Sequence, residues 1–296
     1  MSEFLKDKRV LVTGVNGQVG RALTSALDGK CELIRVARVG GDVALDLTDF
    51  DRIQELFEEL KPDVVINPAA YTQVDRAETE PDLAMKINGD APGVIAEACK
   101  VINATLIHYS TDYVFNGRGD RPYLETDLPD PISVYGCSKL LGEQAVQSVN
   151  CKHIIFRTSW VYDAFGKNFP NAILNKAKKG EDLSVVDDQF GTPNSADFIA
   201  AVTTDVIDRF LKDESLVIEG DRIYHLVASN YCSWFEFAKF LLDILGLNVT
   251  LKAVASGAFP VSARRPTNSR LNNGKLSLLM GYEIEDWRQS AIRCFV

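Results

Sequence analysis

The chain has 296 residues, of which 46% are hydrophobic and 25% charged, and its formal net charge is −9. This composition is ordinary for a globular protein and leaves no room for a long disordered tract. A negative net charge repels a phosphate backbone, and no run of Lys and Arg forms a basic stripe, so we expect no nucleic-acid partner. No segment has the roughly 18 uninterrupted apolar residues of a membrane helix, so we expect no membrane partner.

The N-terminus and the cysteines predict the compartment. The short apolar run near the N-terminus leads directly into a glycine-rich turn, which indicates a first strand rather than a signal peptide. The cysteines are scattered, and no C-x-x-C pair suggests a zinc or redox site. We therefore expect a cytoplasmic protein with reduced thiols that mostly fill the core. The six are Cys31, Cys99, Cys137, Cys151, Cys232 and Cys294.

The first half of the chain alternates short β-branched runs with longer helical stretches, which is the pattern of a parallel sheet covered on both faces. The short runs are apolar throughout, as in strands buried on both sides. Residues 1–165 are therefore predicted to form an α/β, Rossmann-like, doubly wound NAD(P)-binding domain. The expected strands are Arg9–Thr13, Glu32–Val36, Val64–Asn67, Thr105–Tyr109 and Ile154–Arg157. The expected helices are Val19–Leu27, Phe50–Leu60, Leu83–Lys100 (which Pro92 can break) and Val134–Val149.

Beyond Tyr162 the pattern changes, and residues 166–296 are predicted to form a smaller substrate-binding lobe. This lobe interleaves with the first domain, with returns to the sheet expected around 195–228. We expect a helix over 168–180, a strand over 183–188 and a helix opened by Ser195. Ser233 and Glu236 fit a capping box before an apolar stripe, which predicts another helix start.

A glycine-rich turn follows the first strand and opens a helix. Residues 13–20 read T-G-V-N-G-Q-V-G, and Gly14, Gly17 and Gly20 lie three residues apart. Glycines permit a tight turn and let backbone N–H groups approach phosphate oxygens, while the helix N-terminus adds a favourable partial charge. We expect this turn, including Asn16, to bind the pyrophosphate of a dinucleotide. The alternative is a merely structural strand-to-helix turn.

The end of the second strand predicts which dinucleotide is used. NAD-type units usually carry an acidic residue about 20 residues after the turn. Here that region contains Arg35 and Arg38 and no acid. Arg38, with Arg35 as a second candidate, could pair with a 2′-phosphate that a carboxylate would repel. The sequence favours NADPH; NADH stays open, because these arginines could equally be solvated surface residues.

Tyr135 and Lys139 lie four residues apart, on one face of an expected helix. A lysine cation stabilises phenolate, which would lower the tyrosine pKa and make the phenol a better acid toward a developing alkoxide. The pair alone is weak evidence, because chance often produces it. Thr111 ends an earlier apolar strand, where open α/β sheets bind ligands, and could donate to the same oxygen. Together these three residues predict the reduction of a ketone.

With these features together, the chain resembles the extended short-chain dehydrogenase/reductases and, within them, the dTDP-4-dehydrorhamnose reductase family. The resemblance covers nearly the whole chain. It implies reduction of the C4 ketone of dTDP-6-deoxy-L-lyxo-4-hexulose to dTDP-L-rhamnose, with NADPH or NADH. The strings that carry it are PDVVINPAAYTQVDRAE (62–78), HYSTDYVFNG (108–117), YGCSK (135–139), FRTSWVY (156–162), DQFGTP (188–193) and RRPTNSRL (264–271).

The resemblance also implies residue roles. Tyr135 would donate the proton. Lys139 would orient the Tyr135 side chain and bind the nicotinamide ribose, and Thr111 would complete the triad. Substrate contacts would come from Val74, Thr111, Asp112 and Trp160, although Trp160 could equally belong to the core. Further cofactor contacts would come from Gly17, Gln18 and Val19 at the pyrophosphate, Asp46 and Leu47 at the adenine, and Ala69, Ala70 and Tyr71 beyond the strand Val64–Asn67.

Three positions depart from the family pattern, and one of them is Cys137, which takes a place often held by lysine. Asn194 stands where the family usually has threonine, and we expect it to cap the following helix. Some members bind magnesium at a dimer interface through an acidic residue early in the first helix, where this chain has Ala22. We therefore predict no metal site, and a homodimer is only an open option.

Other functions are weighed against this one. Sister dehydratases tend to carry an acid after the threonine–aspartate pair, where this chain has Tyr113, which favours reduction over elimination of water. A UDP-linked 4-keto-6-deoxysugar or an epimerase reaction stays open. So does a non-catalytic role like that of the regulatory subunit of methionine adenosyltransferase, which resembles the same family. The three histidines lie in apolar runs and are expected to be core or interface residues; they are His108, His153 and His225.

Overall fold

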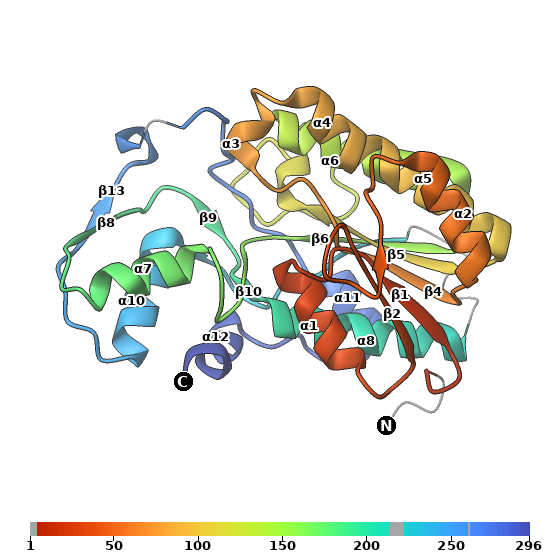
Figure 1. Ribbon diagram of the computed structural model, residues 1–296. Helices are drawn as coiled ribbons and strands as arrows, with labels where there is room; N and C mark the ends of the chain where they lie inside the picture. The colour runs from red at the N-terminus through yellow and green to blue at the C-terminus, as the bar shows by residue number, and fades with distance from the viewer. Residues whose placement is uncertain (1–4, 214–221, 260) are drawn as a thin grey trace.

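The computed structural model describes residues 5–213, 222–259 and 261–296 (Figure 1). Their main sheet has seven strands in the order β11-β6-β5-β4-β1-β2-β3, and every neighbouring pair is parallel. This order confirms the predicted Rossmann-like fold. The strands are β1 (Arg9–Val12), β2 (Glu32–Ala37), β3 (Val43–Ala44), β4 (Val64–Asn67), β5 (Thr105–Thr111), β6 (His153–Thr158) and β11 (Ile223–His225).

Helices cover both faces of this sheet (Figure 1). On one face lie α2 (Phe50–Leu60), α5 (Ala91–Ile102) and α6 (Val134–Val149). On the other lie α1 (Gln18–Leu27), α8 (Ala196–Lys212) and α11 (Gly274–Met280). Short helical turns occur at α3 (Val74–Ala77) and η2 (Asp112–Val114).

One expected helix is interrupted. The stretch predicted as Leu83–Lys100 forms α4 (Pro81–Met85), a π-helical turn η1 (Lys86–Asp90) and then α5. Pro92 lies in the first turn of α5, where a residue without an N–H group is tolerated. The chain therefore changes its hydrogen-bond pattern just before this proline, and the change places Asn88 in the wider π turn.

Two hydrophobic cores, one on each side of the sheet, explain why the strands are apolar throughout. Val10 and Val12 pack into the core shared with α1 and α8, whereas Leu11 between them packs into the core under α2 and α5. Because successive side chains of a strand point to opposite faces, a strand covered on both sides is apolar at every position. Burial of each such side chain stabilises the fold by about 1.5–3 kcal/mol.

The remaining elements lie to one side of the sheet (Figure 1). Small strand pairs join β8 with β13, β9 with β12 and β7 with β10. These strands are β7 (Val161–Tyr162), β8 (Leu183–Val186), β9 (Phe190–Gly191), β10 (Asn194–Ser195), β12 (Cys232–Ser233) and β13 (Leu251–Val254). The helices are α7 (Phe169–Ala177), α10 (Trp234–Ile244), η3 (Ser256–Ala258) and α12 (Trp287–Phe295).

The second half of the chain does return to the sheet through α8 and β11. Within the range 195–228 where returns were expected, residues 214–221 lie outside the described residues. The division into a domain of residues 1–165 and a lobe of residues 166–296 stays a prediction.

Two predicted helix starts are confirmed and one predicted cap is wrong. The capping box that begins α10 is formed in both directions. Ser195 caps α8 by accepting from the Phe198 N–H group. Asn194 therefore does not cap this helix. Its Nδ2 donates to the Ser159 carbonyl at 2.7 Å and its Oδ1 accepts from the Ala228 N–H at 2.7 Å, so it joins three loops instead.

The histidines and cysteines lie largely in the interior. His108, His153 and His225 are buried, as predicted. All six cysteines are free thiols, and Cys99 and Cys151 are among the buried ones. Among the helices of the described ranges, none is both long and apolar enough to cross a membrane.

Candidate active site

The glycine turn brings β1, β4 and α1 into close contact. Gly14 has φ +58°, a left-handed conformation that favours glycine. A Cβ atom on Gly20 would lie 2.2 Å from the Gly14 carbonyl oxygen, and one on Gly14 would lie 2.9 Å from Ala69. Only glycine therefore lets the helix start this close to the turn and lets the turn approach the end of β4.

The N-terminus of α1 is suited to an anion. Its N-cap is Gly17, which makes no side-chain cap within the described structure, and its first turn carries no acid. The first N–H groups of a helix lack intrahelical partners and carry a positive partial charge. The turn therefore has the features of an anion site, and binding of a pyrophosphate by Gly17, Gln18 and Val19 stays a prediction.

Side chains of the same turn reach neighbouring loops. Asn16 Nδ2 donates to the Val39 carbonyl oxygen at 2.7 Å, and thereby ties the turn to the loop after β2. Gln18 Oε1 accepts from Asn168 Nδ2 at 2.8 Å, and Gln18 Nε2 donates to the Val161 carbonyl at 3.4 Å. The Gln18 side chain thus connects the turn to the segment that leads into α7.

A buried polar chain of Thr13, Asn67 and His108 links the ends of β1 and β4 to the middle of β5. Thr13 Oγ1 donates to Asn67 Oδ1 at 2.6 Å, and Asn67 Nδ2 lies 3.2 Å from His108 Nδ1. Burial and the Lys139 cation lower the pKa of His108 well below its ordinary value, so Nδ1 of the neutral ring can accept. Asn67 was not among the predicted site residues, and this network joins the ends of β1 and β4 to β5.

Arg35 within β2 and Arg38 just beyond it differ in their surroundings. Arg35 pairs with Asp28 at 2.8 Å and with Asp42 at 3.5 Å, whereas Arg38 is exposed at the strand end. Arg38 also acts on Asp46: hydrogen bonds from Thr48 lower the pKa of this carboxyl, and the Arg38 charge lowers it further. Arg38 is therefore the better candidate for a 2′-phosphate, and Asp46 lies near it.

The segment after β4 is tied to α6 by Asn88. Tyr71 N donates to Asn88 Oδ1 at 2.8 Å, and Asn88 Nδ2 donates to the Tyr71 carbonyl and to Ser138 Oγ, each at 3.0 Å. A Cβ atom on Gly142 of α6 would lie 2.1 Å from the Asn88 carbonyl oxygen. Asn88 was not among the predicted site residues; it lies between Lys86 and Asp90, so nothing in the local pattern sets it apart from neighbouring polar residues.

The structure brings Thr111, Tyr135 and Lys139 to one end of the sheet. Ser133 caps α6, which presents Tyr135 in its first turn and Lys139 in its second. Lys139 is 3% exposed, and its Nζ donates to the Tyr109 carbonyl oxygen at 2.6 Å. Thr111 ends β5, and hydrogen bonding with it lowers the pKa of Tyr135.

The expected net lowering of the Tyr135 pKa is wrong. Desolvation of the phenol raises this pKa well above the ordinary value, and the Asp112 and Tyr113 side chains raise it further. Lys139 donates to a main-chain oxygen instead, and burial lowers its own pKa to about 8 while the Glu143 charge raises it. Burial is thus the dominant influence on the pKa values of both side chains, and a Y-x-x-x-K spacing does not predict burial.

Asp112 lies beside the same group. Thr111 Oγ1 donates to its Oδ1 at 2.9 Å, and burial raises the pKa of this carboxyl to about 7. Tyr113 packs edge-on against Tyr135 with ring centroids 5.6 Å apart. Val74 is half-buried at the start of α3, next to Asp75, which anchors the 263–265 segment through a 2.7 Å ion pair with Arg265.

Trp160 follows β6 in a left-handed conformation, with φ +44°. Such backbone strain costs about 1–3 kcal/mol and persists only where contacts enforce it. The indole stacks on Trp234 with ring centroids 3.5 Å apart, and a Cβ atom on Gly191 would lie 2.5 Å from it. The sequence analysis did not identify Trp234. That Trp160 contacts a sugar stays a prediction.

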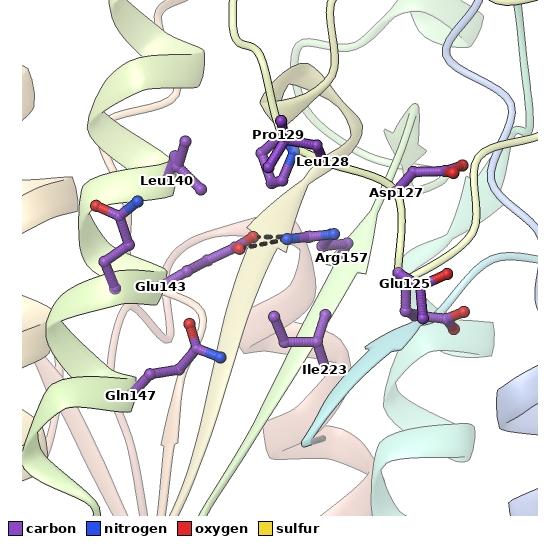
Figure 2. Close-up of a pocket in the computed structure, with 11 residues that line it drawn as sticks. Glu125, Asp127, Leu128, Pro129, Leu140, Glu143, Gln147, Arg157 and Ile223 are labelled. Carbon is purple, nitrogen blue, oxygen red and sulfur yellow. Dashed lines mark hydrogen bonds and ion pairs between the residues drawn. The ribbon is translucent and has the colours of Figure 1, made fainter. Parts of the chain in front are cut away.

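A hollow of about 360 Å³ lies elsewhere, beside α6 and the ends of β6 and β11 (Figure 2). Its lining includes Leu128, Pro129, Glu143 and Arg157 but none of the predicted site residues. Within the described ranges there is no group of three or more His, Cys, Asp or Glu side chains that could hold a metal ion. The predictions of no metal and of an optional homodimer stay predictions.

The parallel sheet, the glycine turn and the grouped Thr111, Tyr135 and Lys139 define an extended short-chain dehydrogenase/reductase. The sequence model of one family, the RmlD substrate binding domain, matches residues 8–296, and the chain belongs to this family. The dTDP-4-dehydrorhamnose reductase of Escherichia coli (strain K12) is 41% identical over 286 residues, which cover 94% of this chain and 94% of that protein. The resemblance predicted from the sequence is confirmed.

Solved structures agree with this membership. The crystal structure of dTDP-4-dehydrorhamnose reductase from Bacillus anthracis in complex with NADP matches with a TM-score of 0.89 and 34% identity, over 98% of this chain and 99% of that one. A dTDP-4-dehydrorhamnose reductase from Clostridium acetobutylicum matches with a TM-score of 0.88 and 37% identity, over 96% of this chain and 97% of that one.

Proposed function

We propose that this chain reduces the C4 ketone of dTDP-6-deoxy-L-lyxo-4-hexulose (dTDP-4-dehydro-L-rhamnose) with NADPH and thereby forms dTDP-L-rhamnose. One observation carries the chemistry: Thr111 and Tyr135 interact at the same end of the sheet as the glycine turn. The choice of sugar is supported by similarity to the reductases named above over nearly their full length.

The residues of the glycine turn fit the cofactor. The N–H groups at the start of α1 would hold the pyrophosphate, and Arg38 would pair with the 2′-phosphate. Ala69 and Ala70 are small enough for a close approach beyond β4. When bound, NADPH supplies the hydride that reduces C4.

Tyr135 would protonate the ketone oxygen. Because its pKa is raised, the phenol keeps its proton near neutral pH and can release it to the more basic alkoxide. Thr111 would share the same oxygen, and Lys139 would hold the nicotinamide ribose. Asp112, Val74 and Trp160 would contact the sugar. Tyr113 stands where a dehydratase tends to have a carboxylate, so this chain lacks that second acid for elimination of water.

The test follows NADPH and NADH absorbance with the dTDP-linked 4-keto sugar and with its UDP analogue. We expect oxidation of NADPH with the dTDP sugar and a product that NMR identifies as dTDP-L-rhamnose. An epimerised 4-keto product without net NADPH oxidation would point to an epimerase. Oxidation with neither sugar would refute the proposal, and recovery of a stoichiometric enzyme partner would then favour the regulatory role.

A further inference from the structure

A buried ion pair lies one helical turn beyond the catalytic lysine. Arg157 of β6 donates from Nε to Glu143 Oε1 at 2.9 Å and from Nη2 to Oε2 at 2.7 Å. The side chains of Arg157 and Glu143 are 2% and 1% exposed. Figure 2 shows the carboxylate, which projects from α6, facing the guanidinium of the neighbouring strand. The pair therefore joins the helix that carries Tyr135 and Lys139 to the sheet.

Stability alone is a weak reason for such a pair. Removing two charges from water is costly, and apolar replacements of similar size are often neutral or stabilising. Here one donor is also left over: Arg157 Nη1 is buried and has no hydrogen-bond partner among the described residues. The guanidinium packs over the Phe115 ring, with Cζ 5.1 Å from the centroid. Its position is therefore set by Glu143 and Phe115.

The geometry relates the pair to Lys139. Residues four apart on a helix share a face, and charges interact strongly where water is excluded. Lys139 is buried, and the hydrogen bond found for its Nζ goes to a neutral acceptor, the Tyr109 carbonyl oxygen. Burial disfavours the ammonium, and the Glu143 charge opposes this effect. Glu143 is thus the carboxylate that compensates a buried cation.

Other titratable groups around Lys139 do not replace Glu143. On β5, His108 is kept neutral because burial and Lys139 itself lower its pKa. Tyr135 keeps its proton, because its pKa is raised. Further buried or half-buried titratable groups near α6 include Cys137 on α6 itself, Asp112 and Tyr113 on η2, and Glu78 after α3, which accepts from the Val134 N–H.

We propose that Glu143, fixed by Arg157, is a positioning residue that keeps the Lys139 side chain in place and in its ammonium form during the reduction. Arg157 in turn limits the excess negative charge behind the lysine. The proposal rests on the proposed function, in which Lys139 holds the cofactor ribose. It assigns two residues that touch neither substrate nor cofactor.

The test compares Glu143→Gln with Arg157→Gln by the pH profile of kcat/KM for the keto sugar at saturating NADPH. The limb that falls with rising pH should report loss of the Lys139 proton. Glu143→Gln leaves Arg157 uncompensated, so this limb should move to lower pH, by roughly one unit. Arg157→Gln leaves Glu143 uncompensated, so the limb should move to higher pH. If both variants lost activity equally and neither limb moved, the pair would have only a structural role and the proposal would be overturned.

Two further measurements guard against misfolding and against failure of the proposed function. The double variant Glu143→Leu/Arg157→Met removes both charges and keeps the volume; its limb should lie between those of Glu143→Gln and the wild type. NMR titration of [13Cε]lysine-labelled protein, with Lys139 assigned through Lys139→Arg, measures the same pKa without turnover. If the wild type does not turn over, the proposed function fails while this titration still tests the charge effect. A Lys139 pKa that none of the variants changes would overturn the inference.

Discussion

The protonation of Tyr135 is decided by its immediate surroundings. Desolvation raises the pKa of the phenol, and hydrogen bonding with Thr111 lowers it only in part. A phenol that holds its proton is suited to donate it, which agrees with reduction in the direction of alcohol formation.

Tyr135→Phe keeps the ring and removes the acid, so we expect kcat to fall by about 10²–10⁴. The matched control is Tyr109→Phe, which removes the hydroxyl of a buried tyrosine. Its hydroxyl lies 2.7 Å from Thr203 Oγ1 on α8. This control should lose stability, by about 1 kcal/mol, and keep its turnover. Steady-state kinetics and thermal unfolding measure both effects, and near-normal turnover of Tyr135→Phe would remove the phenol from the chemistry.

Arg35 in β2 and Arg38 just beyond it allow a second comparison. Arg38 is exposed, whereas Arg35 already pairs with Asp28 and Asp42. Arg38→Ala should weaken NADPH binding by about tenfold and leave NADH binding unchanged, because a charge-assisted contact to the 2′-phosphate is lost. Arg35→Ala should change neither affinity selectively. Fluorescence titration measures the affinity for each cofactor. An equal loss of NADPH and NADH affinity in Arg38→Ala would contradict this prediction.

At the scale of elements, the glycine turn and α1 form one unit. The helix can begin beside the turn only because Gly20 lacks a Cβ atom, which would meet the Gly14 carbonyl oxygen at 2.2 Å. This contact is with backbone, so a larger residue must displace the turn rather than a flexible side chain. The positions of the first N–H groups of α1 depend on it.

Gly20→Ala should therefore weaken NADPH binding by more than about tenfold and destabilise the fold by about 1–3 kcal/mol. Gly257→Ala in η3 is the matched control, since a Cβ atom there meets nothing within 4 Å. Calorimetric titration with NADPH and denaturant unfolding give the two quantities. Unaltered NADPH affinity in Gly20→Ala would show that the turn does not hold the cofactor.

At the scale of the whole molecule, a few polar contacts tie the second half of the chain to the glycine turn. Asn168 caps α7 with its Oδ1, and its Nδ2 donates to Gln18 Oε1 at 2.8 Å. Arg21 of α1 pairs with Asp163 at 2.6 Å. The segment that leads into α7 is thus anchored to the start of α1, where the pyrophosphate is proposed to bind.

Asn168→Asp keeps the acceptor that caps α7 and removes the donor to Gln18, together with its contacts to the Asp163 and Phe165 carbonyls. We expect NADPH binding to weaken by about three- to tenfold, the effect of one or two lost hydrogen bonds. The control is Asn171→Asp. In the wild type, Asn171 Nδ2 donates to the Asp163 and Gly166 carbonyls but not to Gln18. Equal NADPH affinities of the two variants would show that Gln18 does not transmit the contact.

The sequence by itself determined the features that depend on periodicity and near neighbours. The buried strands, the main helices, the capping box at Ser233 and the glycine turn all follow from local patterns. The Tyr135 and Lys139 pair was also readable, because residues four apart on a helix share a face.

Only the tertiary structure decided what depends on burial and on residues far apart in the chain. The bridging contacts of Asn88, the Trp160–Trp234 stack and the Glu143–Arg157 pair join distant segments. The direction of the Tyr135 pKa shift and the contacts of Asn194 with Ser159 and Ala228 belong to the same group. Desolvation and packing are properties of the assembled fold, and no local pattern in the chain encodes their magnitude.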